Sequence, residues 1–153
     1  MPLDLFQPSL KELNEKHHTG YRVIQSGFDL QKLCSQLPNK ISVDLETTGL
    51  NPFRDKVVGV SFSWKDGIAA YVPIGHLTDE AQIPRETTVG YLKPILEDKQ
   101  QTLIFHNAKF DLQFLLNLVT DPLQNDRQIR LSYYFPKIPS ITFAGLTPAF
   151  SSC

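Results

Sequence analysis

A strict alternation of apolar and polar side chains between residues 41 and 46 constrains the fold more than any other feature of this sequence. The apolar set is Ile41, Val43 and Leu45, and the polar set is Ser42, Asp44 and Glu46. Successive side chains of a β-strand point to opposite faces of a sheet, so the pattern predicts a strand with one face in the core. The other face carries Asp44 and Glu46, with Cα atoms about 6–7 Å apart.

A third carboxylate follows another apolar run. Residues 102–106 predict a strand apolar enough for the middle of a sheet covered on both faces. Asn107 is a good N-cap for a helix over residues 108–118. Asp111 lies near the start of that helix, where the helix dipole favours an ionised carboxylate. If the two strands are neighbours, all three acids converge at one edge of the sheet.

Converging carboxylates predict a site for divalent cations. Carboxylates this close repel one another unless a cation lies between them, and Mg²⁺ prefers oxygen ligands. Asp44 also lies inside an apolar run, where an unpaired charge would be costly. Two ions about 4 Å apart could clamp a phosphodiester, activating a water and stabilising the leaving oxygen. The alternative is that each acid is structural, as when a carboxylate pairs with a helix dipole.

The remaining periodicities predict an α/β domain, a mixed sheet with helices packed on it. A cap at Thr87 or Thr88 is expected for a helix that contains Pro94 and ends near Asp98. The other predicted elements are strands at residues 21–25, 57–63 and 69–73, the last two joined through residues 64–67, and a helix at residues 28–37.

Three segments are expected along the chain. Residues 1–20 are predicted to be an irregular lead-in, with the adjacent His17 and His18 exposed rather than chelating a metal. Residues 21–120 carry the domain. Residues 121–153 are predicted to be a divergent and irregular tail, because the sequence from Arg127 onward lacks Asp and Glu and is interrupted by prolines.

Composition excludes several classes of protein. The formal net charge of -1 argues against a protein that coats nucleic acid by bulk charge, but not against an enzyme that grips a strand end. No apolar stretch approaches the roughly 20 residues needed to span a bilayer, so no membrane partner is expected. Two cysteines, Cys34 and Cys153, make no disulfide framework and fit a reducing, cytoplasmic compartment.

Two motifs in this order resemble a known family. Residues 43–50, Val-Asp-Leu-Glu-Thr-Thr-Gly-Leu, resemble the first exonuclease motif of the proofreading domain of DNA polymerase I and its ribonuclease D relatives. Residues 106–111, His-Asn-Ala-Lys-Phe-Asp, resemble their second motif. The resemblance covers about residues 21–118. It implies a ribonuclease-H-like fold whose C-terminal part is incomplete, and 3′-to-5′ removal of nucleotides from a strand end.

The resemblance also implies a role for each acid. Asp44 would bridge two Mg²⁺ or Mn²⁺ ions. Glu46 would bind the ion that activates water, and Asp111 would hold the second ion, directly or through water.

Four neighbouring residues would bind substrate by the same resemblance. Thr47 and Leu50 would contact the terminal nucleotide, and Asn107 and Phe110 would support the substrate strand. Each has an ordinary structural alternative as a strand end, a core residue or a helix cap.

The resemblance ends before the family's third motif. That motif, Tyr-x-x-x-Asp or His-x-x-x-Asp, supplies a fourth carboxylate and orients the attacking water. Here no acid follows Asp126, and neither Tyr133 nor Tyr134 has an Asp four residues later. We therefore expect an apparently truncated and impaired enzyme, because losing such a group costs about 10²–10⁴ in rate.

The leading prediction is a metal-dependent 3′-5′ exonuclease that acts on single-stranded DNA ends and releases nucleoside monophosphates. The alternatives are a non-catalytic nucleic-acid-binding remnant of the same fold and a ribonuclease D-like exonuclease acting on RNA 3′ ends. An unrelated α/β domain with structural acids is a further possibility.

Overall fold

The computed structural model describes residues 9–119 and 141–143, which fold around one mixed β-sheet. The elements in these ranges are α1 (Leu10–His17), β1 (Gly20–Val23), α2 (Gly27–Gln36), β2 (Lys40–Thr47), β3 (Val57–Lys65), β4 (Ile68–Pro73), α3 (Arg85–Glu97), β5 (Thr102–Phe105), α4 (Ala108–Val119) and β6 (Ile141–Phe143). The strand order is β1-β4-β3-β2-β5-β6. The predicted α/β class is therefore confirmed.

The sheet combines an antiparallel centre with parallel edges. β2, β3 and β4 pair antiparallel, whereas β1 pairs parallel with β4, β5 with β2, and β6 with β5. The pairing of β2 with β5 aligns Ile41 with Leu103 and Ser42 with Ile104. The two strands that carry the sequence motifs are thus neighbours, as the convergence of their acids requires.

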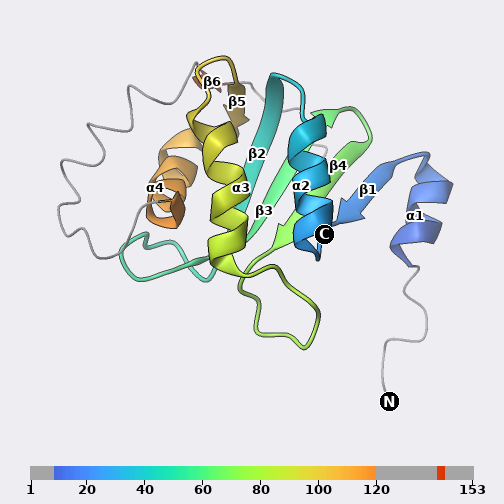
Figure 1. Cartoon of the computed structure of the whole chain (residues 1–153), viewed down its shortest axis with the longest axis horizontal. Coiled ribbons are helices and arrows are strands. Elements are labelled where there is room, and N and C mark those ends of the chain that lie inside the picture. The colour runs from blue at the N-terminus through green and yellow to red at the C-terminus, as the bar shows by residue number, and fades with distance from the viewer. Residues whose placement is uncertain (1–8, 120–140, 144–153) are drawn as a thin grey trace.

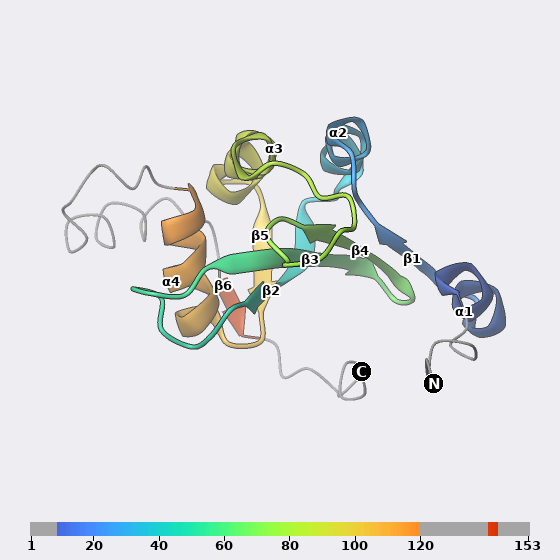
Figure 2. The same ribbon diagram turned by 90° about the horizontal axis from the view of Figure 1, so that it is seen from below.

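Among the described residues, α2 and α3 cover one face of the sheet, and much of the other face has no helix over it. Figures 1 and 2 show α2 and α3 side by side over the same face. The alternation in β2 continues into β3, where Val60 and Phe62 pair with Leu45 and Val43 and are fully buried. The polar positions of β2 lie on the opposite face, where Asp44 and Glu46 are exposed.

The fourth helix closes one end of the sheet. α4 contacts α3, β3 and β5, and α1 lies at the opposite end beside β1 (Figure 2). α4 buries Leu112, Phe114, Leu115 and Leu118, which follow the spacing of one helix face. No helix within the described residues is long and apolar enough to cross a membrane.

The predicted irregular lead-in is wrong for the part of it that the structure describes. Residues 10–17 form α1, because Ser9 and Glu12 make a capping box. The Glu12 carboxylate accepts hydrogen bonds from the Ser9 backbone N–H at 2.7 Å and from its hydroxyl at 2.8 Å. His18 ends the helix in a left-handed conformation, φ 54. His17 and His18 are exposed, as expected.

Two further boundaries differ from prediction. α3 begins at Arg85 after Pro84, not at Thr87 or Thr88, and the Thr88 hydroxyl instead donates to the Pro84 carbonyl at 3.2 Å. β3 and β4 are joined by the two-residue turn 66–67 and not through residues 64–67. Gly67 takes φ +70 there, a left-handed conformation that glycine adopts without strain.

One strand lies inside the segment that was expected to be irregular. Residues 141–143 form β6, which pairs parallel with Leu103 to Phe105 of β5. The rest of that segment, residues 121–140 and 144–153, lies outside the described residues, as do residues 1–8 of the lead-in.

The capping box generates a prediction about α1. None of its residues is buried, so its stability depends on local capping more than on packing. We expect Ser9→Ala to destabilise the helix by about 1 kcal/mol and to raise amide hydrogen exchange across residues 10–17, with little change in melting temperature. Ser35→Ala, which removes an exposed hydroxyl from α2, is the control. Unchanged exchange in α1 would show that the cap does not hold this helix.

Candidate functional site

The polar edge of β2 is the starting point of the site. Asp44 and Glu46 lie on the open face of the sheet and are exposed. The antiparallel register with β3 shifts between Glu46 and Thr47, which leaves Val58 as an extra residue on β3. Such β-bulges bend a strand and often occur beside active sites. Here the bulge ends the regular strand one residue after Glu46.

Asp111 supplies the buried charge of the site. It lies in the first turn of α4 and is only 2% exposed, and its Oδ2 atom has no hydrogen-bond partner within the part of the chain that the structure describes. Burial, and then the nearby Asp44 carboxylate, raise the pKa of Asp111 to about 6. Backbone N–H groups of Asn107 and Asp111 and the nearby His106 act in the opposite direction. A carboxylate held in this way is poised to accept a cation or a proton.

The structure brings two of the three predicted acids within electrostatic reach of each other. The Asp44 carboxylate contributes to raising the pKa of Asp111, whereas the Glu46 carboxylate contributes to raising the pKa of Tyr71. Among the described residues, no three His, Cys, Asp or Glu side chains are close enough together to hold one metal ion as they stand. The prediction that Asp44 carries a costly charge inside an apolar run is wrong: alternation exposes Asp44, and the acid that is buried is Asp111.

Thr47 is the last residue of β2, and the loop that follows the strand carries Leu50. Thr47 is half-buried and donates its hydroxyl to the Gly49 carbonyl at 2.7 Å. Leu50 is 83% exposed. The loop is fixed by Asp55, which accepts the Asn51 N–H at 2.8 Å and whose carboxylate leaves no room for a side chain at Gly49.

Asn117 ties this loop to α4. Its side-chain amide donates to the Pro52 carbonyl, and its own carbonyl accepts a 2.8 Å hydrogen bond from Arg85 of α3. The loop after the first motif is therefore anchored to the helix that carries the second motif.

Asn107 and Phe110 occupy the positions that the sequence predicts. Asn107 directly precedes α4 and is exposed, and its carbonyl accepts the N–H groups of Phe110 and Asp111 at 2.9 and 3.1 Å. Phe110 is half-buried and packs against the core, with its ring 4.7 Å from that of Phe114. Phe110 therefore contributes to packing of the core, and the exposed part of its ring remains accessible to a bound molecule.

Sequence reasoning missed Tyr71 and His76. Tyr71 lies on β4 on the same face as Asp44, and its hydroxyl is hydrogen-bonded to His76 Nε2. The available signal was Gly59, a glycine inside a strand, which often marks a close approach of another group.

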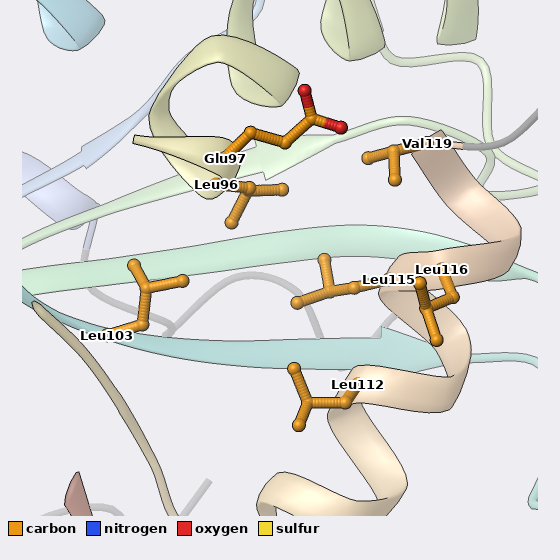
Figure 3. A pocket seen from close by; sticks show the side chains of 7 residues that line it. All are labelled: Leu96, Glu97, Leu103, Leu112, Leu115, Leu116 and Val119. Atoms are coloured by element: carbon orange, nitrogen blue, oxygen red, sulfur yellow. The ribbon is translucent and has the colours of Figure 1, made fainter. Parts of the chain in front are cut away.

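A separate hollow lies between α3, α4 and β5. Figure 3 shows its lining, which is apolar except for Glu97, an acid that pairs with Lys93 at 3.6 Å. The lining residues are Leu96, Glu97, Leu103, Leu112, Leu115, Leu116 and Val119. None of them is a predicted site residue, so this hollow is distinct from the acidic edge.

The residues named above in connection with a third motif, Asp126, Tyr133 and Tyr134, lie outside the described residues. The site is therefore built here from β2, β3, β4, the loop after β2 and α4.

The fold and the acidic edge together define a ribonuclease-H-like α/β domain. The structure is similar to that of S. pombe Pop2p solved with Mg²⁺ and Mn²⁺ bound, with a TM-score of 0.61 over 80% of this chain and 73% of that chain. The sequence identity is 12%, so this likeness establishes the fold alone.

Sequence comparison establishes the family. A family profile described as 3′-5′ exonuclease matches residues 21–147, and the chain belongs to that family. The match continues beyond Leu118, where the resemblance of the motifs ends, and it includes β6. Members of this family act on the ends of nucleic acid strands.

Two curated relatives are DNA polymerases. The chain is 40% identical to DNA polymerase I of Pseudomonas aeruginosa over 98 residues, which cover 63% of the chain and 11% of that protein. It is 34% identical to DNA polymerase I of Chloroflexus aurantiacus over 95 residues, which cover 61% of the chain and 10% of that protein. The matched region thus spans about a tenth of the length of each relative.

Asp111 generates a pH-dependent prediction for protein kept in a chelator. Its pKa of about 6 in the folded state exceeds the value of about 3.9 expected when unfolded. The protonated form therefore adds stability that is fully present below about pH 4 and lost as the pH rises through about 6. We expect Asp111→Asn to be about 1–2 kcal/mol more stable than wild type at pH 8, allowing for screening, and to have no such advantage near pH 4.

Urea unfolding at the two pH values measures this difference. Asp79→Asn, at an exposed loop position, is the matched control and should show no pH-dependent gain. Equal stability of wild type and Asp111→Asn at pH 8 would contradict the burial of an unpaired charge at this position.

Proposed function

We propose that this domain is a metal-dependent 3′-5′ exonuclease that acts on single-stranded DNA ends and releases nucleoside monophosphates. One observation supports this most directly: the buried, unpartnered oxygen of Asp111 lies near the Asp44 carboxylate. The two acids come from the two motifs that the family shares, and a cation between them would relieve their repulsion.

The residues present fit hard divalent cations. The donor set is all oxygen, which suits Mg²⁺ or Mn²⁺, and Asp111 Oδ2 is an acceptor with nothing to accept. In this proposal Asp44, Glu46 and Asp111 hold the ions, two in the complete family site. When bound, such ions lower the pKa of a water and stabilise charge on a phosphodiester.

The residues of the chain itself bind and orient the strand end. Leu50, four residues after Glu46 in the chain, has an exposed apolar side chain, suited to packing against the terminal base, and Thr47 is the last residue of β2. Asn107 and the exposed part of Phe110 border the site from the start of α4, where they support the strand. The hydrogen bond from the Asn117 side-chain amide to the Pro52 carbonyl connects the loop that carries Leu50 to α4, the helix that follows Asn107.

The relatives favour DNA over RNA as the substrate. Both polymerases described above are DNA polymerases, at 40% and 34% identity. A ribonuclease D-like activity on RNA 3′ ends is the second candidate, because the same fold and acids serve either sugar. The two cysteines of the chain, Cys34 and Cys153, fit a reducing compartment such as the cytoplasm.

We propose further that the 153-residue chain by itself is a weak enzyme. Three carboxylates leave two divalent ions one negative charge short of balance, and no acid follows Asp126. A missing orienting or acid-base group costs about 10²–10⁴ in rate. Binding of a strand end requires neither the fourth carboxylate nor the orienting group. If the loss of rate is complete, the chain is a non-catalytic nucleic-acid-binding remnant.

Purified chain incubated with a 3′-labelled single strand tests the function. We expect slow, Mg²⁺-dependent mononucleotide release that is faster on DNA than on RNA of the same sequence, and that stops with chelator or in Asp44→Ala. Mg²⁺ should also raise the melting temperature of wild type but not of Asp44→Ala, since a ligand that binds only the folded state stabilises it.

Asp79→Ala is the matched control and should behave as wild type. A melting shift without release would favour the non-catalytic remnant. Release that survives Asp44→Ala would contradict the assigned site.

A further inference from the structure

Tyr71 and the acids of β2 share one face of the sheet. Asp44 pairs with Ser61 on β3, and Ser61 pairs with Tyr71 on β4. Directly paired residues of antiparallel strands project to the same side. The next position along that face is occupied by Glu46 and its partner Gly59.

Because Gly59 has no side chain, the space above β3 between Tyr71 and Glu46 can be occupied by the Tyr71 ring. A Cβ atom at Gly59 would overlap the hydroxyl oxygen, Cζ and Cε2 of Tyr71, so the phenol ring lies across the space that a side chain would fill. Gly59 is itself buried beneath it. The ring thus crosses β3 toward the strand that carries Glu46.

His76 holds the Tyr71 hydroxyl in this position. The hydroxyl and His76 Nε2 are hydrogen-bonded, and the two ring centroids are 5.9 Å apart. Gln82 fixes the backbone of His76 from both sides: its side-chain oxygen accepts the His76 N–H and its amide donates to the His76 carbonyl, each at 2.7 Å.

The bulge beside Glu46 anchors the same loop. The carbonyl of Val58 accepts the N–H groups of Ile74 and Gly75 at 2.8 and 3.2 Å. The segment leading to His76 is therefore attached at the point where β3 departs from regular pairing next to Glu46. These hydrogen bonds connect the segment before His76 to β3 beside Glu46, whereas α4 brings Asp111 close to Asp44.

The direction of the hydrogen bond between Tyr71 and His76 decides whether the Tyr71 hydroxyl can donate to another group. If His76 donates through Nε2–H, the Tyr71 oxygen accepts that hydrogen bond and its O–H is free to point elsewhere. A phenol is protonated at neutral pH, so the Tyr71 O–H is then able to donate to a neighbouring acceptor.

We propose that Tyr71, oriented by His76 across Gly59, is a positioning residue that holds the Glu46 carboxylate for cation binding. The inference rests on the proposed function, because it requires Glu46 to be a cation ligand. Partners that orient a ligand are commonly worth ten- to hundredfold in metal affinity. The role concerns how the ligand is held and includes no covalent step.

Mn²⁺ binding to the full chain, measured by electron paramagnetic resonance, tests this role without relying on turnover. Tyr71→Phe removes only the hydroxyl and should weaken Mn²⁺ binding about tenfold. Tyr21→Phe, which removes a hydroxyl from the edge strand β1, should leave it unchanged. His76→Phe should act like Tyr71→Phe, and His76→Gln, which retains an N–H donor, should recover part of the loss.

Gly59→Ala gives an independent second arm. It keeps the phenol but displaces it, so Mn²⁺ binding should fall as in Tyr71→Phe while thermal melting shows a folded chain. Wild-type affinity in a folded Gly59→Ala or Tyr71→Phe variant would overturn the positioning role.

The two levels of the inference fail in different ways. Mn²⁺ binding that disappears in Asp44→Ala but is unchanged in Tyr71→Phe would overturn the role of Tyr71 and leave the proposed function standing. Wild-type chain that takes up no Mn²⁺ would overturn both.

Discussion

The parallel pairing of β2 with β5 is the contact on which the site depends. It brings together two segments that are far apart in sequence: β2, which carries Asp44 and Glu46 on one face, and β5, which is followed by the helix that carries Asp111. Because the strands are parallel and in register from Lys40 and Thr102, their carboxyl ends meet at one edge. α4 begins at this edge, three residues after the end of β5. Its first turn therefore places Asp111 near Asp44 without a long connecting loop.

This arrangement places a destabilising interaction inside a well-packed core. Asp111 is buried, like Leu112 and Phe114 of the same helix, yet among the described residues one of its oxygens has no partner and its neighbour Asp44 is like-charged. Locally consistent sequences avoid such conflicts except where function requires them. The conflict therefore supports a ligand at this edge more strongly than the exposed acids of β2 do, since those are well solvated on their own.

The sequence could predict the parts of the structure that depend on local periodicity. Alternation in β2 determined which side of the strand is buried, and the apolar run before Asn107 located β5 and the start of α4. Burial of Asp111 instead depends on how α4 packs on the sheet, which no short-range pattern encodes. α1 has no buried residue and depends on the Ser9–Glu12 capping box, a local signal that lies outside any apolar periodicity.

Tyr71 could not have been found from its neighbours in sequence. Its position relative to Glu46 depends on the registers of two strand pairs and on a glycine in the strand between them. The proposed site consists of residues aligned in rows across the sheet, perpendicular to the strands, whereas a sequence motif follows the chain along one strand. Distant relatives of the same fold need only preserve the buried rows, so a shared fold at 12% identity leaves the chemistry of the open face to be argued residue by residue.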